Sequence, residues 1–365
     1  MQSFKFIDLF CGCGGFSYGL EQAGHQCLLG VDFNAEAIAT FQKNHKSAIG
    51  LNLDIGKLSK SMLKKYIDIN EVDMVVGGPP CQGFSTVGKG DASDARNSLF
   101  KQFVRVVKLT EPKVIMFENV TGILAKKNEK TLKNIFASFE RLGYHIEAQV
   151  LSADDYRVPS RRRRAIIIGV RGGKPVFPKK SSRRISVKEA FKNLNGKLYN
   201  HNIELAEIKN KLDKERLSFI PQGRGIRYEK DEKQFLPKRL RYNVDWAELA
   251  ENRFRQTRLQ RIPLDEPAPT ILTSRSMYYH PIEDRYLTPR EAAKLQSFPN
   301  KFVFEGSVTA QFRQIGNAVP PGLGKALGKA ISSIRFSQLK DSKTKLDARL
   351  VASNAFTYKN HKKAS

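Results

Sequence analysis

The chain has 365 residues, a formal net charge of +27 at pH 7 and an apolar content of 40%. This length allows one large domain or two unequal ones. No stretch approaches the roughly eighteen successive apolar residues of a membrane helix. The N-terminal residues become acidic too early, at Asp8, for a signal peptide, so we expect a cytoplasmic protein that makes no membrane contact.

The charge is distributed unevenly along the chain. Residues 1–150 carry 18 Lys or Arg against 15 Asp or Glu, whereas residues 151–365 carry 45 against 21. A net charge of +24 in the second part favours binding to a polyanion, and nucleic acid in particular, over charge that merely keeps the protein in solution. The four cysteines form no Cys-x-x-Cys pair or Cys/His cluster, so we expect no metal site and no disulfide framework.

Strand and helix patterns alternate over the first 170 residues. We predict strands at 4–10, 26–31, 72–76, 113–117, 144–151 and 165–170, and helices at 16–23, 35–45, 60–67, 98–110 and 131–142. This alternation predicts an α/β fold with a doubly wound, mainly parallel sheet and a ligand crevice at the carboxyl ends of its strands. Residues 172–262 are basic and show no readable periodicity. Helix patterns return at Thr288, which is predicted to cap a helix, and at 322–334.

A glycine-rich loop follows the first strand. Gly12 and Gly14 lie in it, but Ser17 stands where the third glycine of a dinucleotide-binding loop belongs, so turn glycines explain the loop equally well. Asp32 ends the second strand twenty residues later, where an acid binds ribose hydroxyls. The glycine-rich loop and Asp32 together favour a cofactor that contains a nucleoside.

The segment GGPPCQGFS (77–85) follows the predicted strand 72–76. A lone cysteine such as Cys81 is most often a buried core residue. Here the glycines and prolines before it and the polar residues after it indicate a loop at the end of a strand. That position favours a nucleophile.

These motifs together resemble those of the DNA (cytosine-5)-methyltransferases of bacterial restriction–modification systems. The resemblance covers nearly the whole chain except 172–262 and the C-terminal tail. It rests on DLFCGCGGFS (8–17), Asp32, Asp54-Ile55, GGPPCQGFS (77–85), ARNSLF (95–100), FENV (117–120), the arginines of 161–164, RYLTPREAAKLQSFP (285–299) and QIGNAVPP (314–321).

The resemblance implies a Rossmann-like methyltransferase that uses S-adenosylmethionine. Cys81 matches the nucleophile that adds to cytosine C6, and Glu118 matches the acid that engages N3 and N4 of the base. Asn119 is expected to hold the loop, although a turn residue at a strand end is an equal alternative. Arg162 and Arg164 match the arginines that hold the flipped base. Ser160 replaces the usual glutamine, so which of the four arginines faces cytosine stays open.

The resemblance also implies a cofactor pocket and a loop that closes on DNA. Phe10, Gly12 and Gly14 match the loop under the methionine part, Asp32 the ribose contact, Phe33 the adenine face, and Asp54 and Ile55 the adenine edge. Pro80, Leu99, Asn317 and Val319 complete the family pocket. Because a base within duplex DNA must flip out to be reached, residues 86–97 are expected to close over it. The residues expected to contact DNA there are Ser85, Lys89 and Arg96.

We predict a discontinuous catalytic domain (1–172 and 312–335), a small domain (173–311) with the target-recognition region at about 173–262, and a mobile basic tail (336–365). Expected partners are double-stranded DNA and a restriction endonuclease that shares the site, in a protein associated with the nucleoid if bacterial.

Three other functions remain open. A tRNA cytosine methyltransferase would share the core, although Gly83-Phe84-Ser85 favours DNA. A non-catalytic DNA-binding homologue would lack the nucleophile or the glutamate, and both are present. A nicotinamide-dependent dehydrogenase is suggested by the glycine loop and Asp32 alone.

Overall fold

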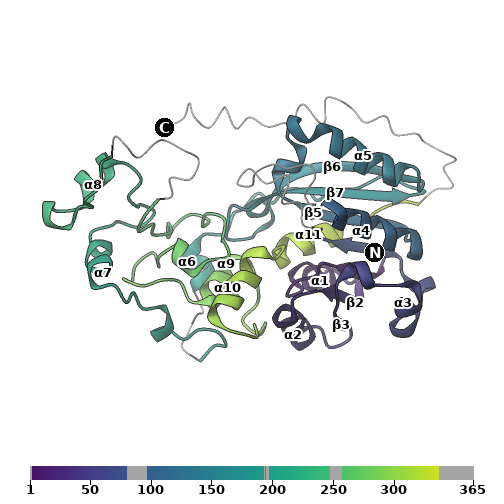
Figure 1. Ribbon diagram of the computed structural model, residues 1–365, viewed down its shortest axis with the longest axis horizontal. Helices are drawn as coiled ribbons and strands as arrows, with labels where there is room; N and C mark the ends of the chain where they lie inside the picture. The colour runs from purple at the N-terminus through teal and green to yellow at the C-terminus, as the bar shows by residue number, and fades with distance from the viewer. Residues whose placement is uncertain (1, 80–96, 193, 195–196, 247–256, 337–365) are drawn as a thin grey trace. The chain divides into compact units, whose positions relative to one another are not determined.

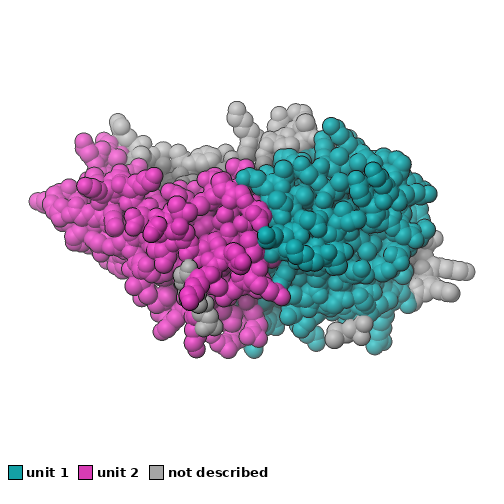
Figure 2. Space-filling view, turned by 90° about the horizontal axis from the view of Figure 1, so that it is seen from below, with its two compact units in different colours: residues 1–156, 163–182, 318–365 teal, residues 157–162, 183–317 magenta. Residues whose placement is uncertain are grey.

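The computed structural model describes residues 2–79, 97–192, 194, 197–246 and 257–336. The chain divides into two compact units, coloured in Figure 2. Unit 1 comprises residues 1–156, 163–182 and 318–365, and unit 2 comprises residues 157–162 and 183–317. None of the helices in the described residues is long and apolar enough to cross a membrane.

Unit 1 is built on a seven-stranded sheet of order β3-β2-β1-β4-β5-β7-β6 (Figure 1). Neighbouring strands from β3 to β5 are parallel, whereas β7 runs antiparallel to both β5 and β6. The predicted doubly wound, mainly parallel sheet is therefore confirmed. The strands are β1 (Lys5–Leu9), β2 (Gln26–Asp32), β3 (Ile49–Asn52), β4 (Met74–Gly77), β5 (Val114–Asn119), β6 (Tyr144–Ser152) and β7 (Arg163–Arg171).

Helices cover both faces of this sheet because alternate residues of the central strands are apolar on both sides. Ile7, Val75 and Phe117 belong to one buried cluster, and Phe6 and Met116 belong to the other. The first cluster is covered by α3 (Lys60–Tyr66), α4 (Asn97–Thr110) and α5 (Glu129–Glu140). The second is covered by α1 (Gly15–Glu21), α2 (Ala35–Asn44) and α11 (Pro321–Ile331).

The direction of strand order reverses between β1 and β4. Strands β2 and β3 lie on one side of β1, and β4 and β5 lie on the other. In such sheets the loops at the carboxyl ends of the two central strands diverge and leave a crevice for a ligand. A Cβ on Gly77, at the end of β4, would lie 2.2 Å from the carbonyl oxygen of Leu9, so only glycine permits this close approach of β4 to β1.

Unit 2 has its own apolar core, which includes Leu217, Leu236, Leu240 and Tyr279. Thr288 caps α9 by accepting the Glu291 N–H, as the sequence predicts. The helices of unit 2 are α6 (Val187–Phe191), α7 (Lys211–Ser218), α8 (Glu229–Phe235), α9 (Pro289–Leu295) and α10 (Val308–Asn317).

The unit boundaries differ from the predicted domain boundaries at three short segments. Residues 157–162 belong to unit 2, where the Arg161 N–H donates to the Ala268 carbonyl and the Ala268 N–H donates to that of Pro159. Residues 312–317 complete α10, which packs on α9 in unit 2. Residues 173–182 stay in unit 1, because Ser181 and Lys180 both bond to Asp155.

Candidate active site

The loop after β1 has an unusual backbone. Phe10, Gly12 and Gly14 have φ values of 59°, 54° and 86°, in the left-handed region that disfavours side chains. A Cβ on Gly14 would also lie 2.3 Å from His45 Nε2, so no other residue fits there. A Cβ on Gly12, by contrast, would meet no atom within 4 Å. The loop therefore turns sharply and exposes the backbone of Gly12 on an open side.

Asp32 ties this loop to the end of β2. Its carboxylate accepts the N–H groups of Gly12 and Asn34, each at 2.9 Å. Burial raises the pKa of Asp32, and these N–H groups oppose the rise. The side chain is half-buried and beside the open flank of Gly12. A carboxylate held in this way is suited to accept a pair of ribose hydroxyls.

The residues beside Asp32 also fit a nucleoside. The side chain of Phe33 is 75% exposed, which leaves an aromatic ring available to cover a base. Asp54 caps a short 3₁₀ turn, η1 (Ile55–Lys57), by accepting the Gly56 N–H at 2.8 Å. Ile55 is buried, and Phe10 and Leu99 pack half-buried against the same cluster. The open glycine loop, the exposed ring and the held carboxylate are together compatible with an adenine nucleoside.

A second group of predicted residues meets at the end of β5. Glu118 is 9% exposed, and its Oε1 lies 2.6 Å from Arg164 Nε at the start of β7. A Cβ on Gly78 would lie 3.6 Å from Glu118 Oε2, so the carboxylate faces Gly78, three residues before Cys81. The structure thus brings an ion-paired carboxylate next to the predicted nucleophile loop.

Asn119 bonds to the same loop. Its Nδ2 donates to the Pro79 carbonyl at 2.9 Å, and its Oδ1 accepts the Val120 N–H at 2.9 Å. Pro79 is the last residue described before 80–96. Asn119 therefore fixes the start of the loop and also closes the turn at its own strand end.

The structure also describes three further predicted residues, Arg162, Asn317 and Val319. Arg162, in unit 2, is 2% exposed and donates to the carbonyls of Gly316 and Asn317 at 2.8 and 3.3 Å. Asn317 is exposed at the end of α10 in unit 2, and Val319 is buried in unit 1. The predicted residues that lie outside the described residues are Pro80, Cys81, Ser85, Lys89 and Arg96.

Two contacts in unit 1 were not predicted. Ser17, which replaces the third glycine, donates its hydroxyl to Asp8 Oδ2 at 2.5 Å. Burial raises the pKa of Asp8 to about 7, against the effect of this bond. The acid between Ile7 and Leu9 in the predicted strand 4–10 was the available signal. The second contact is that of Arg105 with the η1 turn, which no local pattern indicates.

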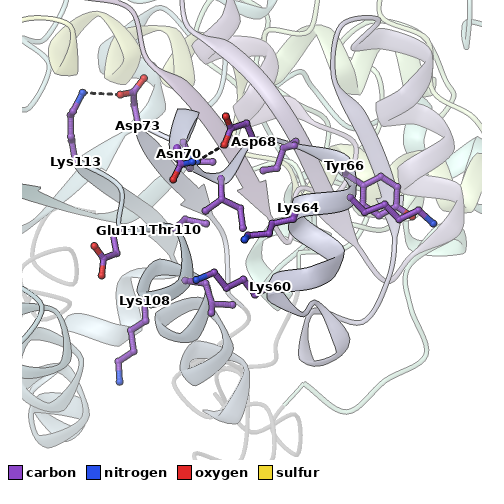
Figure 3. Close-up of a pocket in the computed structure, with 15 residues that line it drawn as sticks. Lys60, Lys64, Tyr66, Asp68, Asn70, Asp73, Lys108, Thr110, Glu111 and Lys113 are labelled. Carbon is purple, nitrogen blue, oxygen red and sulfur yellow. Dashed lines mark hydrogen bonds and ion pairs between the residues drawn. The ribbon is translucent and has the colours of Figure 1, made fainter.

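The described residues also form an open hollow of about 1060 Å³ at the amino ends of β4 and β5, opposite the carboxyl ends where the candidate site lies (Figure 3). The hollow lies beside the residues that precede β4 and β5. It is lined by Lys60, Lys64 and Lys108 and by the ion pair between Lys113 and Asp73, whose atoms are 3.0 Å apart. None of the predicted site residues lines this hollow. Within the described residues, the candidate site therefore consists of the loops after β1, β2 and β5 and of residues 78–79 after β4.

Comparisons with known proteins identify the family of the chain. Residues 4–333 match the family model described as C-5 cytosine-specific DNA methylase, a family that uses S-adenosylmethionine as methyl donor. The chain is 36% identical to type II methyltransferase M1.HphI of Haemophilus parahaemolyticus, over 92% of this chain and 88% of that protein. It is 34% identical to type II methyltransferase M.DdeI of Desulfomicrobium norvegicum, over 90% and 88%.

A solved structure shares the fold. A crystal structure described as that of a prophage-encoded DNA modification methyltransferase (E. coli) superposes with a TM-score of 0.69 at 25% identity and covers 90% of this chain and 98% of that one. The family model spans most of the sequence, and both relatives exceed 30% identity over most of their length. The chain therefore belongs to the C-5 cytosine-specific DNA methylase family and is a DNA (cytosine-5)-methyltransferase.

Proposed function

We propose that the protein methylates one cytosine in a specific short sequence of duplex DNA, as the modification enzyme of a type II restriction–modification system. The observation that carries this proposal is the ion pair between Glu118 and Arg164, which faces Gly78 just before Cys81. The names of the relatives, both type II methyltransferases, support the biological setting. A restriction endonuclease that cuts the same site would be its functional partner.

Cys81 carries the central step. Cytosine C5 is a poor nucleophile, but addition of a thiolate to C6 breaks the C5–C6 double bond and makes C5 electron-rich. S-adenosylmethionine supplies an electrophilic methyl group at its sulfonium. Once C5 carries the methyl group, loss of its proton and departure of the cysteine sulfur restore the double bond. The balance is 5-methylcytosine, S-adenosylhomocysteine and one proton.

Glu118 and its partners would prepare the base for this addition. Negative charge builds on N3 as sulfur adds to C6, and a carboxyl group that carries a proton stabilises this charge by donating to N3 while its other oxygen accepts from the N4 amine. Arg164 fixes the orientation of the Glu118 side chain and balances the charge of the carboxylate that remains once the proton moves to N3. Asn119 holds the start of the loop through Pro79. Arg162 would act at a distance, by keeping residues 316–317 in place.

The cofactor would bind across the ends of β1 and β2. Asp32 would accept the ribose hydroxyls, Phe33 would cover adenine, and Asp54 and Ile55 would contact the adenine edge. Phe10, Gly12 and Gly14 would lie under the methionine part. The rest of the pocket would come from Pro80, Leu99, Asn317 and Val319.

Target recognition would come from the basic part of the chain. Residues 173–262 lie largely in unit 2, and their excess of Lys and Arg suits contact with phosphates. Flipping the target base costs a few kcal/mol, which contacts from the closing loop would offset. Ser85, Lys89 and Arg96 are the residues proposed for that loop.

The test is base-resolution mapping of cytosine methylation in genomic DNA from a methylation-free host. The host expresses either the wild type or the matched Cys81→Ser variant. One short motif methylated by the wild type alone is the expected result. Unmodified DNA from a folded protein that binds S-adenosylmethionine would contradict the proposal, and tRNA from the same cells would then be mapped.

A further inference from the structure

Arg105 links α4 to the turn that follows Asp54. Its Nη1 donates to the Leu58 carbonyl at 2.6 Å and its Nη2 to the Ile55 carbonyl at 2.7 Å. Its Nε donates to Gln102 Oε1, one helical turn earlier, at 2.6 Å. The guanidinium is thus half-buried and held on both sides.

Ile55 begins the short η1 turn, and Leu58 is the residue that caps its C-terminal end, where backbone carbonyls lack helical partners. At its other end, the Asp54 carboxylate accepts the Gly56 N–H. The Asp54 side chain therefore holds the start of the turn, and Arg105 bonds to the carbonyls of Ile55 and Leu58. Without Arg105, the Ile55 carbonyl would still accept the Leu58 N–H at 3.2 Å. The Leu58 carbonyl would lose the hydrogen bond that Arg105 donates to it.

Apolar packing joins the same two elements. Ile55 and Leu58 are buried in one cluster with Phe103, Val106 and Val107 of α4. Helix α4 begins at Asn97, immediately after the segment that contains Cys81 and the proposed closing loop. Helix α4 therefore follows the catalytic segment and, two helical turns after its start, bonds through Arg105 to the η1 turn that is proposed to contact adenine.

We propose that Arg105 is a positioning residue for the methyl donor, which sets Asp54 and Ile55 at the distance needed to select adenine by its edge. This inference rests on the proposed function. A guanidinium can bond two carbonyls at once because its donors form a rigid fork, whereas a lysine ammonium is a single point charge. Arginine is thus required to hold both carbonyls at once, whereas a lysine would hold only one of them.

The test compares two ligands that differ only at the adenine edge. S-adenosylhomocysteine carries the exocyclic amine, and S-inosylhomocysteine carries an oxygen in its place. We expect the wild type to bind the adenine compound at least about tenfold more tightly, the worth of one or two hydrogen bonds. Arg105→Met should reduce that preference to about twofold, and Arg105→Lys should give an intermediate value, both measured by calorimetry.

Arg216 provides a matched control in unit 2. It is also half-buried on a helix, α7, and its Nε donates at 2.7 Å to the Leu240 carbonyl at the end of the 3₁₀ turn η8 (Lys238–Leu240). Arg216→Met should lower the midpoint of thermal unfolding as Arg105→Met does, because both variants lose donors to turn carbonyls. Its preference for adenine over hypoxanthine should remain that of the wild type.

The possible results of these binding measurements distinguish a failure of the positioning role of Arg105 from a failure of the proposed function. An unchanged adenine preference in Arg105→Met, or an equal loss of affinity for both compounds, would overturn the positioning role while the methyltransferase assignment stands. The same change in Arg216→Met would assign the effect to general destabilisation and also overturn it. A wild type that binds neither compound would overturn the proposed cofactor site itself.

Discussion

Arg164 and Glu118 lie on neighbouring antiparallel strands, with Nε 2.6 Å from Oε1. The register places Ala165 opposite Asn119, so Arg164, the second residue of β7, lies just beyond the end of β5. Their side chains are only 17% and 11% exposed, which limits screening by water. The pair therefore holds a carboxylate in one orientation at the edge where the nucleophile loop begins.

Replacement of Arg164 by methionine should slow methyl transfer by about 100-fold or more, because the carboxylate loses the group that orients it and balances its charge. Affinity for S-adenosylmethionine should stay within about twofold, since Arg164 does not contact the glycine loop. Single-turnover methylation and calorimetry measure the two effects. The adjacent, exposed Arg163 gives the control variant Arg163→Met. Equal rates for Arg163→Met and Arg164→Met would refute the assignment.

Arg162 should behave differently, because its buried side chain donates to two backbone carbonyls. Arg162→Met leaves the carbonyls of Gly316 and Asn317 without these donors, and we expect the free energy of unfolding to fall by about 2–4 kcal/mol. Arg161 is exposed and ion-paired with Glu266, so Arg161→Met should cost less than about 1 kcal/mol. Urea denaturation of the two variants compares them, and similar losses would contradict the prediction.

The arginines illustrate what the sequence could not decide. Four consecutive arginines leave the register open, and a shift of one residue exchanges the sides of a strand. The structure places Arg164 beside Glu118 and buries Arg162 against residues 316–317. Ser17 and Arg105 escaped prediction for a related reason. Their partners lie 9 and about 50 residues away in sequence, beyond any local pattern.

The fold was predictable where burial imposes a pattern. Strand β4 and strand β5 are buried throughout, and both were predicted from apolar runs. Strand β3 was missed because it has only four residues, lies at the sheet edge and is half-exposed. Helix α7 was missed because Leu217 alone is buried among its eight mostly charged residues, so it has almost no apolar stripe.

Asp32→Ala should weaken binding of S-adenosylmethionine by about 10- to 100-fold, the worth of hydrogen bonds to a charged group. Binding to duplex DNA should change by less than about threefold. Asp32→Asn is the matched variant, since its amide oxygen can still accept one of the two N–H groups that Asp32 receives from Gly12 and Asn34. Asp32→Asn should therefore lose less affinity for S-adenosylmethionine than Asp32→Ala does. Titration calorimetry for the cofactor and anisotropy for DNA measure both constants, and equal losses for the two ligands would refute the ribose role.

Asp8 should make stability depend on pH. Its carboxyl group is fully buried in β1, and burial raises its pKa to about 7, while the Ser17 hydroxyl and His45 act in the opposite direction. Below about pH 4, both the folded and the unfolded chain hold the proton, so Asp8 imposes no penalty. Between about pH 4 and 7 the unfolded chain releases the proton and the folded chain keeps it. The free energy of unfolding therefore falls as pH rises through this window, by at most about 1.4 kcal/mol per pH unit, and levels off above pH 7.

The variant Asp8→Asn removes this titration but keeps an oxygen that accepts the Ser17 hydroxyl. Its free energy of unfolding, minus that of the wild type, should rise from pH 5 to pH 7 and then stay constant, as measured by urea denaturation at each pH. Ser17→Ala gives a second check with a definite sign. Because the Ser17 bond lowers the pKa of Asp8, its loss should move the end of the window to higher pH. Parallel stability curves for Asp8→Asn and the wild type would show that Asp8 is already ionised in the folded protein at pH 5, and a buried charge of that kind would need a partner other than Ser17.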